Sequence, residues 1–149
     1  MYLEHTLRIE ATPERVYDFF QNLEKNYCRW HNSHIYLEWL KGEPLSKGAV
    51  LNAEEWLFGE VRKHKLKLLE VIPGRLLIFT PVSPFQRLFL YRVMFEMEPL
   101  GDSATLYRSR VHLRLDAIGS WLFQKYVEAA EVHLEEETEN LKTILESCS

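Results

Sequence analysis

Apolar and polar residues alternate along most of the chain between Tyr2 and Leu115, a period-2 pattern that is typical of β-strands with two different faces. Turn-forming residues at Gly59, at Pro73-Gly74 and around Gly101 divide the later part of this region into a meander. The pattern predicts strands at Tyr2–Ala11, Ile35–Leu40, Val50–Leu57, Val61–Val71, Leu76–Thr80, Leu90–Met97 and Ala104–Leu115.

The last two predicted strands indicate how the sheet is oriented. Each has one apolar side and one charged side, so the sheet has an apolar face that another element must cover. Acidic residues on the charged side of the first strand, such as Glu96, can pair with basic residues of the second, and His112 lies on this outer side. The apolar sides consist of Tyr91, Val93, Phe95 and Met97 in one strand and of Tyr107, Ser109, Val111, Leu113 and Leu115 in the other.

Three segments carry the signals of helices. Thr12 is suited to an N-cap and is followed by Pro13, so a helix is expected from there to about Gln21. A second short helix or turn is expected from Leu23 to Trp30. A long amphipathic helix is predicted from Ile118 to Leu145, and it is the only element large enough to cover the apolar face of the sheet.

The apolar stripe of this long helix contains two ionisable residues. At about 100° per residue, His133 and Glu137 fall in the middle of the stripe, although the opposite face of the helix is rich in charge. A histidine and a carboxylate one turn apart that point inward are candidate metal ligands or a candidate catalytic pair. The alternatives are a hydrogen-bonded core histidine and a glutamate that lines a wet cavity. The other members of the stripe are Leu122, Tyr126, Ala130, Leu141 and Ile144.

Length and composition indicate one domain, residues 1–149, because 149 residues with 46% hydrophobic side chains suffice for a core or an internal cavity. The aromatic share of 13% can line a pocket as well as fill a core, and core packing is expected of Trp30 and Trp56. Two cysteines, Cys28 and Cys148, are too few for a disulfide framework, and Cys28 is expected to be a buried thiol.

The charge balance excludes some classes of partner. A formal net charge of −4 argues against binding to nucleic acid or to an anionic membrane surface. No segment reaches the roughly 18 apolar residues of a membrane span, and the first residues lack the apolar region of a secretion signal. We therefore expect a soluble, cytoplasmic protein, and the sequence gives no indication of its oligomeric state.

The order of elements, together with the segment ATPERVYDFF at residues 11–20, resembles the START/Bet v1-like helix-grip superfamily, also called SRPBCC. The resemblance implies an α+β fold in which a curved antiparallel sheet wraps around the long C-terminal helix, with two short helices near the N-terminus. It also implies a cavity between sheet and helix for a small hydrophobic or aromatic ligand. The superfamily includes lipid-transfer proteins, plant hormone receptors and polyketide cyclases, so the resemblance does not imply one function.

Several short motifs resemble a metal-binding branch of this superfamily, the diacetylphloroglucinol and phloretin hydrolases. Those enzymes cleave a carbon–carbon bond between an acyl group and a phenol ring, with zinc held by two histidines and two glutamates. The resemblance implies ligands at His133, Glu137, Glu55 and His34, or at His31 in place of His34. The motifs are Trp30-His31-x-x-His34, Glu-Trp-Leu-Lys-Gly at 38–42, Glu54-Glu55-Trp56, and His133-x-x-x-Glu137 followed by Glu139-Asn140-Leu141-Lys142.

Periodicity supports the two glutamates. The helical phase places Glu137 within the buried stripe and Glu136 at its edge. Strand alternation favours Glu55 over Glu54, although Val50 and Trp56 lie on the same side as Glu54 and weaken this assignment. The residues that share a side with Glu55 are Leu51, Ala53 and Leu57.

The upstream histidine is harder to assign. If the strand already includes His34, this residue points with Tyr36 and Glu38, away from the apolar Ile35. His34 faces the cavity only if the apolar row is outside or if it precedes the strand on a loop. The resemblance ranks His34 first, and His31 remains a close alternative.

Two imidazoles and two carboxylates suit Zn²⁺, and this ligand set also admits Mn²⁺, Fe²⁺ or Ni²⁺. Tyr91, Tyr107 and His64 are expected on the inner side of their strands and are candidate acid–base groups. The predicted function is that of a metal-dependent hydrolase acting on a small aromatic or acyl-phenol-like compound. The alternatives are a non-catalytic protein that binds or transports a hydrophobic ligand and a polyketide cyclase or aromatase that needs no metal.

Overall fold

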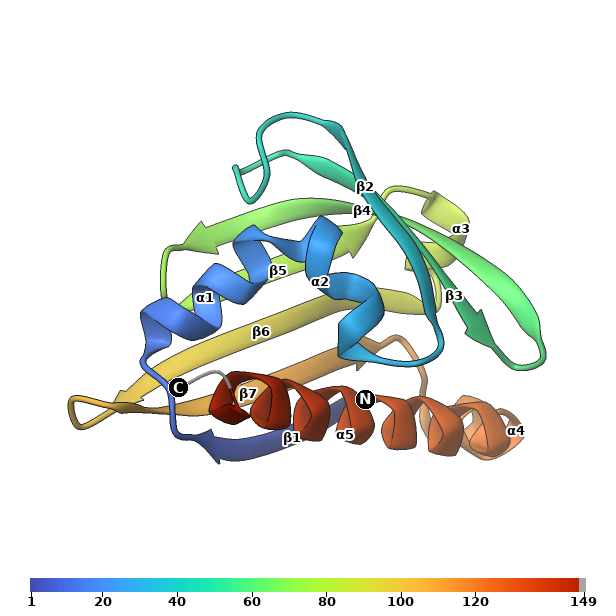
Figure 1. Cartoon of the computed structure of the whole chain (residues 1–149). Coiled ribbons are helices and arrows are strands. Elements are labelled where there is room, and N and C mark those ends of the chain that lie inside the picture. Colours follow the sequence, from blue (N-terminus) through green and yellow to red (C-terminus); the bar gives the residue numbers. More distant parts are fainter. Residues whose placement is uncertain (148–149) are drawn as a thin grey trace.

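The computed structural model describes residues 1–147, which form one seven-stranded antiparallel sheet and five helices (Figure 1). The strand order is β1-β7-β6-β5-β4-β3-β2, so the first strand pairs with the last, and β1 and β2 form the two edges. The strands are β1 (Tyr2–Ile9), β2 (His34–Lys41), β3 (Val50–Leu57), β4 (Glu60–Ile72), β5 (Leu76–Pro81), β6 (Leu90–Leu100) and β7 (Ala104–Leu113). The helices are α1 (Pro13–Gln21), α2 (Leu23–Trp30), α3 (Pro84–Arg87), α4 (Ala117–Leu122) and α5 (Gln124–Ser147).

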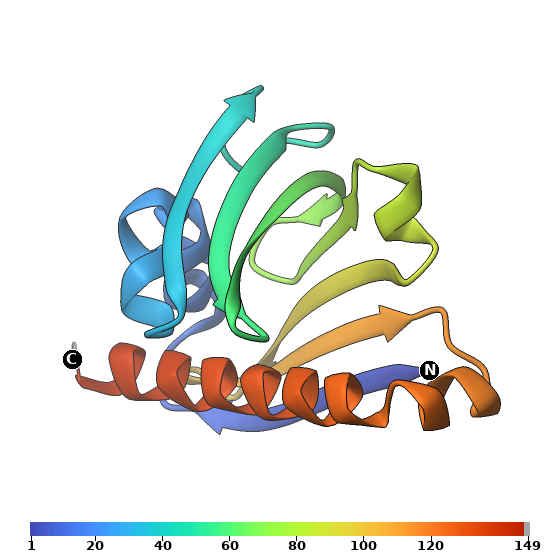
Figure 2. The ribbon, with the colours of Figure 1, turned by 90° about the vertical axis from the view of Figure 1, so that its right-hand side faces the viewer.

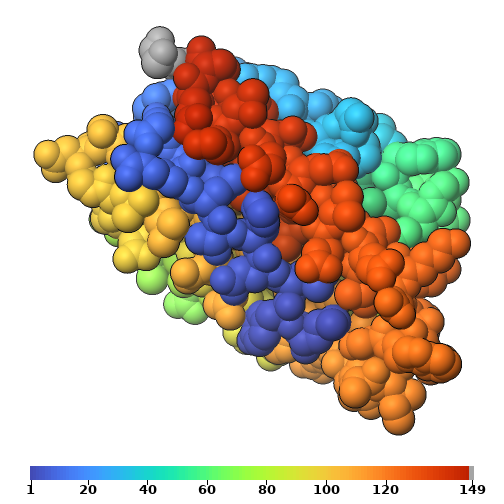
Figure 3. Space-filling view, turned by 90° about the horizontal axis from the view of Figure 1, so that it is seen from below, coloured from blue at the N-terminus to red at the C-terminus, as the bar shows by residue number. Residues whose placement is uncertain are grey.

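The sheet curls around α5, as Figure 2 shows. One side of α5 packs along β1, which Figure 3 shows in blue beside the orange and red helix. The other side of α5 faces the start of β2 and the end of β3. The short helices close one end of the curl, because α1 packs on β6 and β7 while α2 packs on β2 and α5. This is the arrangement expected from the sequence.

The first helix begins where the sequence predicts. The side chain of Thr12 accepts a hydrogen bond from the backbone N–H of Arg15, at 3.3 Å, and so satisfies one of the free donors at the helix start. Pro13 occupies the first helical position, where its missing N–H costs nothing. The predicted ends of both short helices, Gln21 and Trp30, are confirmed.

The orientation of the sheet also agrees with the alternation pattern. In β7 the side chains of Tyr107, Ser109 and Leu113 are buried. On the outer side, Arg108 lies 3.1 Å from Glu96 of β6, so the acidic and basic rows pair across the hairpin as expected. The apolar face therefore looks toward α5.

An aromatic core fills the end of the molecule that α1 and α2 close. The Phe20 ring lies 4.9 Å from the ring of Phe95 and 5.6 Å from that of Trp30, and all three are buried. Each buried aromatic side chain contributes about 1.5–3 kcal/mol of transfer free energy. This packing fixes Trp30 at the end of α2, directly before the histidines of the segment that follows.

The predicted helix from Ile118 to Leu145 is interrupted. It consists of α4 and α5, separated at Phe123, and Asp116 caps α4 by accepting a hydrogen bond from the backbone of Gly119 at 2.7 Å. Leu122 and Tyr126, expected in the buried stripe, are 62% and 45% exposed. The first turns of α5 reach the end of the sheet, as Figure 2 shows, so the sheet covers them only in part.

Three expectations about single residues have different outcomes. Trp30 is buried as predicted, whereas Trp56 is 54% exposed because it lies on the outer side of β3. Cys28 is exposed rather than buried, because its side of α2 faces away from the core, and Cys148 lies outside the described residues.

Within residues 1–147, none of the helices combines the length and the apolar character that crossing a membrane would require.

Candidate functional site

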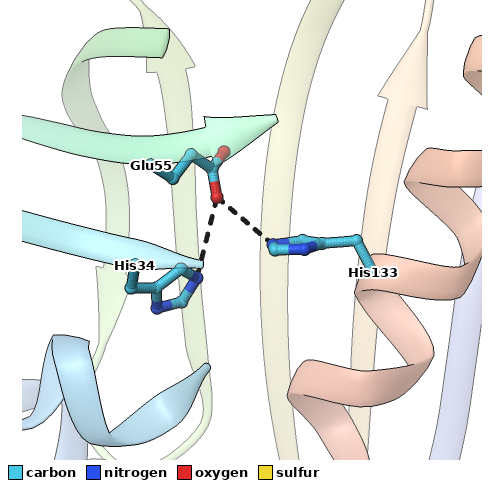
Figure 4. Close-up of side chains that lie close together, drawn as sticks. All are labelled: His34, Glu55 and His133. Atoms are coloured by element: carbon cyan, nitrogen blue, oxygen red, sulfur yellow. Dashed lines mark ion pairs between the residues drawn. The ribbon is translucent and has the colours of Figure 1, made fainter. Parts of the chain in front are cut away.

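Four of the expected metal ligands lie together where the start of β2, the end of β3 and the middle of α5 meet. His133 Nε2 is 3.2 Å from Glu55 Oε2 and 3.1 Å from Glu137 Oε1. His34 Nε2 is 3.2 Å from Glu137 Oε2 and 3.7 Å from Glu55 Oε2. Figure 4 shows His34, Glu55 and His133 pointing toward one another, and ligand atoms of these three residues lie within 4.8 Å of one another.

An irregularity at the start of β2 turns His34 inward. The pairing of β2 with β3 shifts between His34 and Tyr36, so that His34 and Leu37 are both buried while Ile35 and Tyr36 are both exposed. Simple alternation would place His34 opposite Leu37, and the extra residue removes this conflict. The structure thus gives a physical reason why alternation alone did not assign this histidine.

The ring of His34 is held in one orientation. Its Nδ1 lies 2.7 Å from the backbone carbonyl of Tyr27, and because a carbonyl only accepts, Nδ1 carries the proton. The ring also stacks on that of Tyr27, with 3.9 Å between centroids and 5° between planes. Nε2 therefore points at the carboxylates of Glu55 and Glu137. A histidine whose other nitrogen donates to a backbone carbonyl is a common arrangement in metal sites.

Trp30 fixes α5 relative to the segment that carries His34. Its indole N–H donates a hydrogen bond to the backbone carbonyl of Glu137 at 2.9 Å, and its own carbonyl accepts one from the side chain of Asn140 at 3.0 Å. Two hydrogen bonds to adjacent turns set both the distance and the helical rotation of α5. The direction of Glu137 thus depends on a residue of α2.

Glu55 lies on the inner side of β3, as alternation predicts, whereas Glu54 pairs with Lys63 on the outer side at 3.4 Å. The second oxygen of Glu55 is 3.1 Å from Nε2 of His64 in β4. His64 therefore adjoins the cluster, as its expected inward orientation requires.

The cluster has strongly shifted protonation equilibria. Burial lowers the pKa of His133, but Glu137 and Glu55 outweigh it and raise this pKa to about 10. Burial favours the neutral form of both carboxyls, yet His133 and His64 hold the pKa of Glu55 well below its usual range. In the same way, burial is outweighed for Glu137, whose pKa is lowered by His133 and His34. Without a metal ion, His133 is therefore protonated at neutral pH.

The cluster also fits a divalent cation. Nε2 of His133 and Nε2 of His64 are buried and have no hydrogen-bond partner, although carboxylate oxygens lie 3.1–3.2 Å away. The nitrogens and oxygens thus converge without forming well-directed hydrogen bonds to one another. Two imidazoles and two carboxylates are a ligand set that suits Zn²⁺.

His31 has a different set of partners. Its Nδ1 accepts a hydrogen bond from the backbone N–H of Ser33 at 3.0 Å, so Nε2 carries the proton and donates to Glu136 Oε2 at 2.6 Å. The ring lies 4.3 Å from that of His133. His31 and Glu136 also line a cleft of about 560 Å³ between α2 and α5. His34 is the histidine that faces both Glu55 and Glu137.

The two candidate tyrosines lie in different environments. Tyr107 is fully buried, and burial together with the charge of Glu137 raises its pKa well above the usual value, against a smaller opposing effect of Ser109. Tyr91 was expected on the inner side, but its ring packs against His112 and Arg114 of the outer row. The cause is a shift in the β6–β7 pairing between Leu90 and Arg92, which breaks the alternation at Tyr91.

Sequence reasoning missed the residues that hold the ligands in place. Tyr27 orients His34, while Trp30 and Asn140 orient Glu137. Tyr27 and Trp30 share the buried side of α2, which is a visible signal in the sequence. Their contacts to His34 and Glu137 join distant parts of the chain and carry no periodic signature.

Comparison with solved structures identifies the fold. A START superfamily protein from Mycobacterium smegmatis has a TM-score of 0.76 at 15% identity, over 99% of both chains. The Zhui aromatase/cyclase from Streptomyces sp. R1128 has a TM-score of 0.76 at 12% identity, over 98% of this chain and 93% of the other. Norcoclaurine synthase from Thalictrum flavum in complex with dopamine and hydroxybenzaldehyde has a TM-score of 0.71 at 14% identity, over 100% and 88%. The chain has the Bet v1-like helix-grip fold.

At these identities the likeness is one of fold. No protein-family model matches the chain, and no curated protein matches its sequence. The structural neighbours are START/Bet v1-like proteins, and a polyketide aromatase/cyclase is among them. None of the three neighbours above is described as a metal protein or a hydrolase, so the expected zinc and hydrolase activity rest on the residues of the cluster.

Proposed function

We propose that the protein binds a divalent metal ion, zinc before others, at His34, Glu55, His133 and Glu137, and that it hydrolyses a small acyl-aromatic compound there. One observation carries this proposal: ligand atoms from two strands and one helix converge at 3.1–3.7 Å, and a buried nitrogen of His133 has no hydrogen-bond partner.

The chain supplies the four ligands and their support. His34 presents Nε2 because its Nδ1–H is engaged by the Tyr27 carbonyl, and Glu137 is held through Trp30. A bound divalent ion would lower the pKa of water toward about 7 and polarise a carbonyl group. His64, 3.1 Å from the second oxygen of Glu55, orients that carboxylate.

Tyr107 is the candidate proton donor. Burial and the charge of Glu137 keep its hydroxyl protonated at neutral pH, although the side chain of Ser109 acts in the opposite direction. Hydrolysis of an acyl–aryl bond adds the oxygen of water to the acyl carbon and a proton to the ring carbon. The phenol of Tyr107 can hold a proton for the second of these transfers. Tyr91, on the outer face, has no place in this scheme.

The first test is the metal content of the purified protein. Elemental analysis is expected to find close to one divalent ion per chain, and to find it missing from His133→Ala and Glu137→Ala. Glu135→Ala is the matched control, because Glu135 is an exposed residue of the same helix. Wild-type protein that contains no metal after growth and dialysis in zinc would refute the metal site.

The second test is activity. Metal-loaded protein is expected to hydrolyse a member of a panel of acylphenols, and a chelator is expected to abolish the reaction. Tyr107→Phe is expected to lower kcat by about 10²–10⁴-fold while the metal remains bound, since a positioned acid or base typically contributes that much. If the protein bound metal but hydrolysed none of the acylphenols, the result would indicate a metal-stabilised binding protein and not a hydrolase.

One observation favours a second candidate. Without metal, the cluster is a buried network of a protonated His133 and two carboxylates, which suits acid–base chemistry on a polyketide or simple binding of an aromatic ligand. Structural neighbours include an aromatase/cyclase and a synthase bound to two aromatic compounds. A metal-free protein that binds aromatic compounds in a His133-dependent manner would support this alternative.

A further inference from the structure

Two short helices at one end of the molecule have exposed apolar surfaces. They are α3, which joins β5 to β6, and α4, which follows β7. Figure 2 shows both helices beside the start of β6 and the end of β7. Neither helix buries a residue. Helices of four and six residues are not stable in water by themselves, so they depend on packing against another surface.

The five most exposed large apolar side chains of residues 1–147 lie in α3, at its C-cap or in α4. Among them, Phe85 is 84% exposed, Trp121 72% and Ile118 70%. Phe89 follows α3 and Phe123 follows α4, and their rings contact edge to face at 6.3 Å between centroids, so the two helices share one continuous surface. This surface, here called the apolar end, consists of Phe85, Leu88, Phe89, Ile118, Trp121, Leu122 and Phe123.

The apolar end is large enough to form one side of a protein–protein interface. A fully exposed phenylalanine or tryptophan side chain offers about 150–250 Å², and a leucine or isoleucine side chain roughly 60–120 Å². At their exposed fractions, the seven side chains together expose roughly 400–900 Å². Each partner of a standard interface contributes about 800 Å². The area is therefore in the range that a dimer needs from each copy.

The charges of the apolar end can complement one another between two copies. Within residues 84–89 and 116–123, the only charged side chains are Arg87 in α3 and Asp116 at the N-cap of α4, and both are exposed. Neither side chain forms an ion pair within residues 1–147. A two-fold axis between α3 and α4 brings Arg87 of one copy opposite Asp116 of the other, twice in the dimer. A membrane surface matches less well, because it favours a rim of cations alone and the net charge here is −4.

We propose that the apolar end is a dimer interface and that it binds the apolar end of a second copy of this chain. The two copies are related by a two-fold axis that places α3 of each copy against α4 of the other. The apolar side chains then bury one another, and the pairs of Arg87 with Asp116 set the relative position of the copies. The interface lies outside the His/Glu cluster, so the dimer is expected both with metal and in the presence of a chelator.

Sedimentation velocity of the full chain tests the dimer. The wild-type protein is expected to be a dimer that dissociates on dilution. Phe85→Glu and Trp121→Glu are each expected to be monomers at concentrations where the wild type is a dimer, because each change places two unpaired carboxylates in the interface. Both positions are exposed in the single chain, so both variants are expected to keep the wild-type circular dichroism spectrum. A wild-type protein that is monomeric at every concentration, or a dimer that persists in both variants, would overturn the proposal.

Ile72→Glu is the matched control. Ile72 is 48% exposed and lies beyond the other end of β5 from α3, so this variant is expected to remain a dimer. A monomeric Ile72→Glu variant would place the interface elsewhere and refute the assignment to the apolar end. Vesicles of phosphatidylcholine and phosphatidylglycerol test the other occupant. A monomeric wild-type protein that sediments with these vesicles, together with a Trp121→Glu variant that does not, would assign the surface to a membrane instead of a second copy.

A double-mutant cycle tests the pairing of α3 with α4. Arg87→Gln and Asp116→Asn each remove one charge, and asparagine remains a good N-cap for α4. Each variant is expected to raise the dissociation constant of the dimer by about 2–30-fold, because the two-fold axis repeats an exposed ion pair. The double variant is expected to be weakened no further than either single variant, since both changes remove the same pairs. Fully additive losses would show that the two side chains do not pair and would overturn this arrangement.

Discussion

His31 and His34 are three residues apart and both buried, yet they belong to different hydrogen-bonded groups. His34 points its Nε2 at Glu137 and Glu55, while His31 donates to Glu136. His34→Gln is therefore expected to remove stoichiometric metal, measured by elemental analysis and by titration with zinc. His31→Gln is expected to weaken binding by no more than the about 10–100-fold typical of an outer-sphere change. If His31→Gln lost the metal and His34→Gln kept it, His31 rather than His34 would be the metal ligand.

The protonation of His133 makes the stability of the metal-free protein depend on pH. Its pKa is raised from 6.5 to about 10 in the folded protein, so at pH 8 the folded state binds a proton that the unfolded state releases. The stabilisation is complete below about pH 6.5 and is lost as the pH approaches 10. Thermal unfolding in the presence of a chelator is expected to show a falling Tm between pH 7 and 10. His133→Gln is expected to flatten this decline, and an equally steep profile in that variant would argue against His133 as its source.

The sequence allowed the helical half of the cluster to be predicted, because helical phase separates Glu137 from Glu136. Strand alternation also placed Glu55 correctly on the inner side of β3. It could not assign His34, which lies before an irregular pair in β2, and it misplaced Tyr91 for the same kind of reason in β6. An irregularity of this kind arises from the pairing of two strands. The alternation of residues along one strand therefore does not reveal it.

At the scale of elements, α2 and α5 are joined mainly through Trp30. Replacing it with phenylalanine removes the N–H that donates to the Glu137 carbonyl and part of a buried ring. Trp30→Phe is expected to lower the free energy of unfolding by about 1–3 kcal/mol and to weaken metal binding. Urea unfolding and zinc titration measure the two effects. Asn140→Ala removes the reciprocal hydrogen bond, and the double variant is expected to lose less than the sum of the single losses, because both changes affect one contact.

Most elements could be predicted from the sequence because their start and stop signals are local, as with Thr12 and Pro13 at α1. The break at Phe123 could not, since the apolar stripe continues through it. The interruption lies near the end of the sheet. Leu122 before it and Tyr126 after it are both exposed. The apolar stripe therefore correctly predicted an apolar helix surface, but it did not predict which part of that surface the sheet leaves uncovered.

At the scale of the whole molecule, the four proposed ligands link segments that are far apart in the chain, β2, β3 and α5. An ion that binds only the folded state stabilises it by about 2.7 kcal/mol when its concentration is 100 times Kd. Zinc is therefore expected to raise Tm by several degrees in a concentration-dependent way, as differential scanning fluorimetry would show. His133→Ala, which lacks a ligand, serves as the control. A rise of equal size in that variant would indicate that zinc acts elsewhere.

The pairing of β1 with β7 has a consequence for the timing of synthesis. Residues 2–9 must wait for their partners at 105–112, so the sheet cannot close until residue 112 has been made. At about 5–20 residues per second, this delay is on the order of 5–20 s, during which the edge of β1 is available to other chains and to chaperones. Glu137 emerges later still. The cluster is therefore complete only after residues 34 to 137 have all been made.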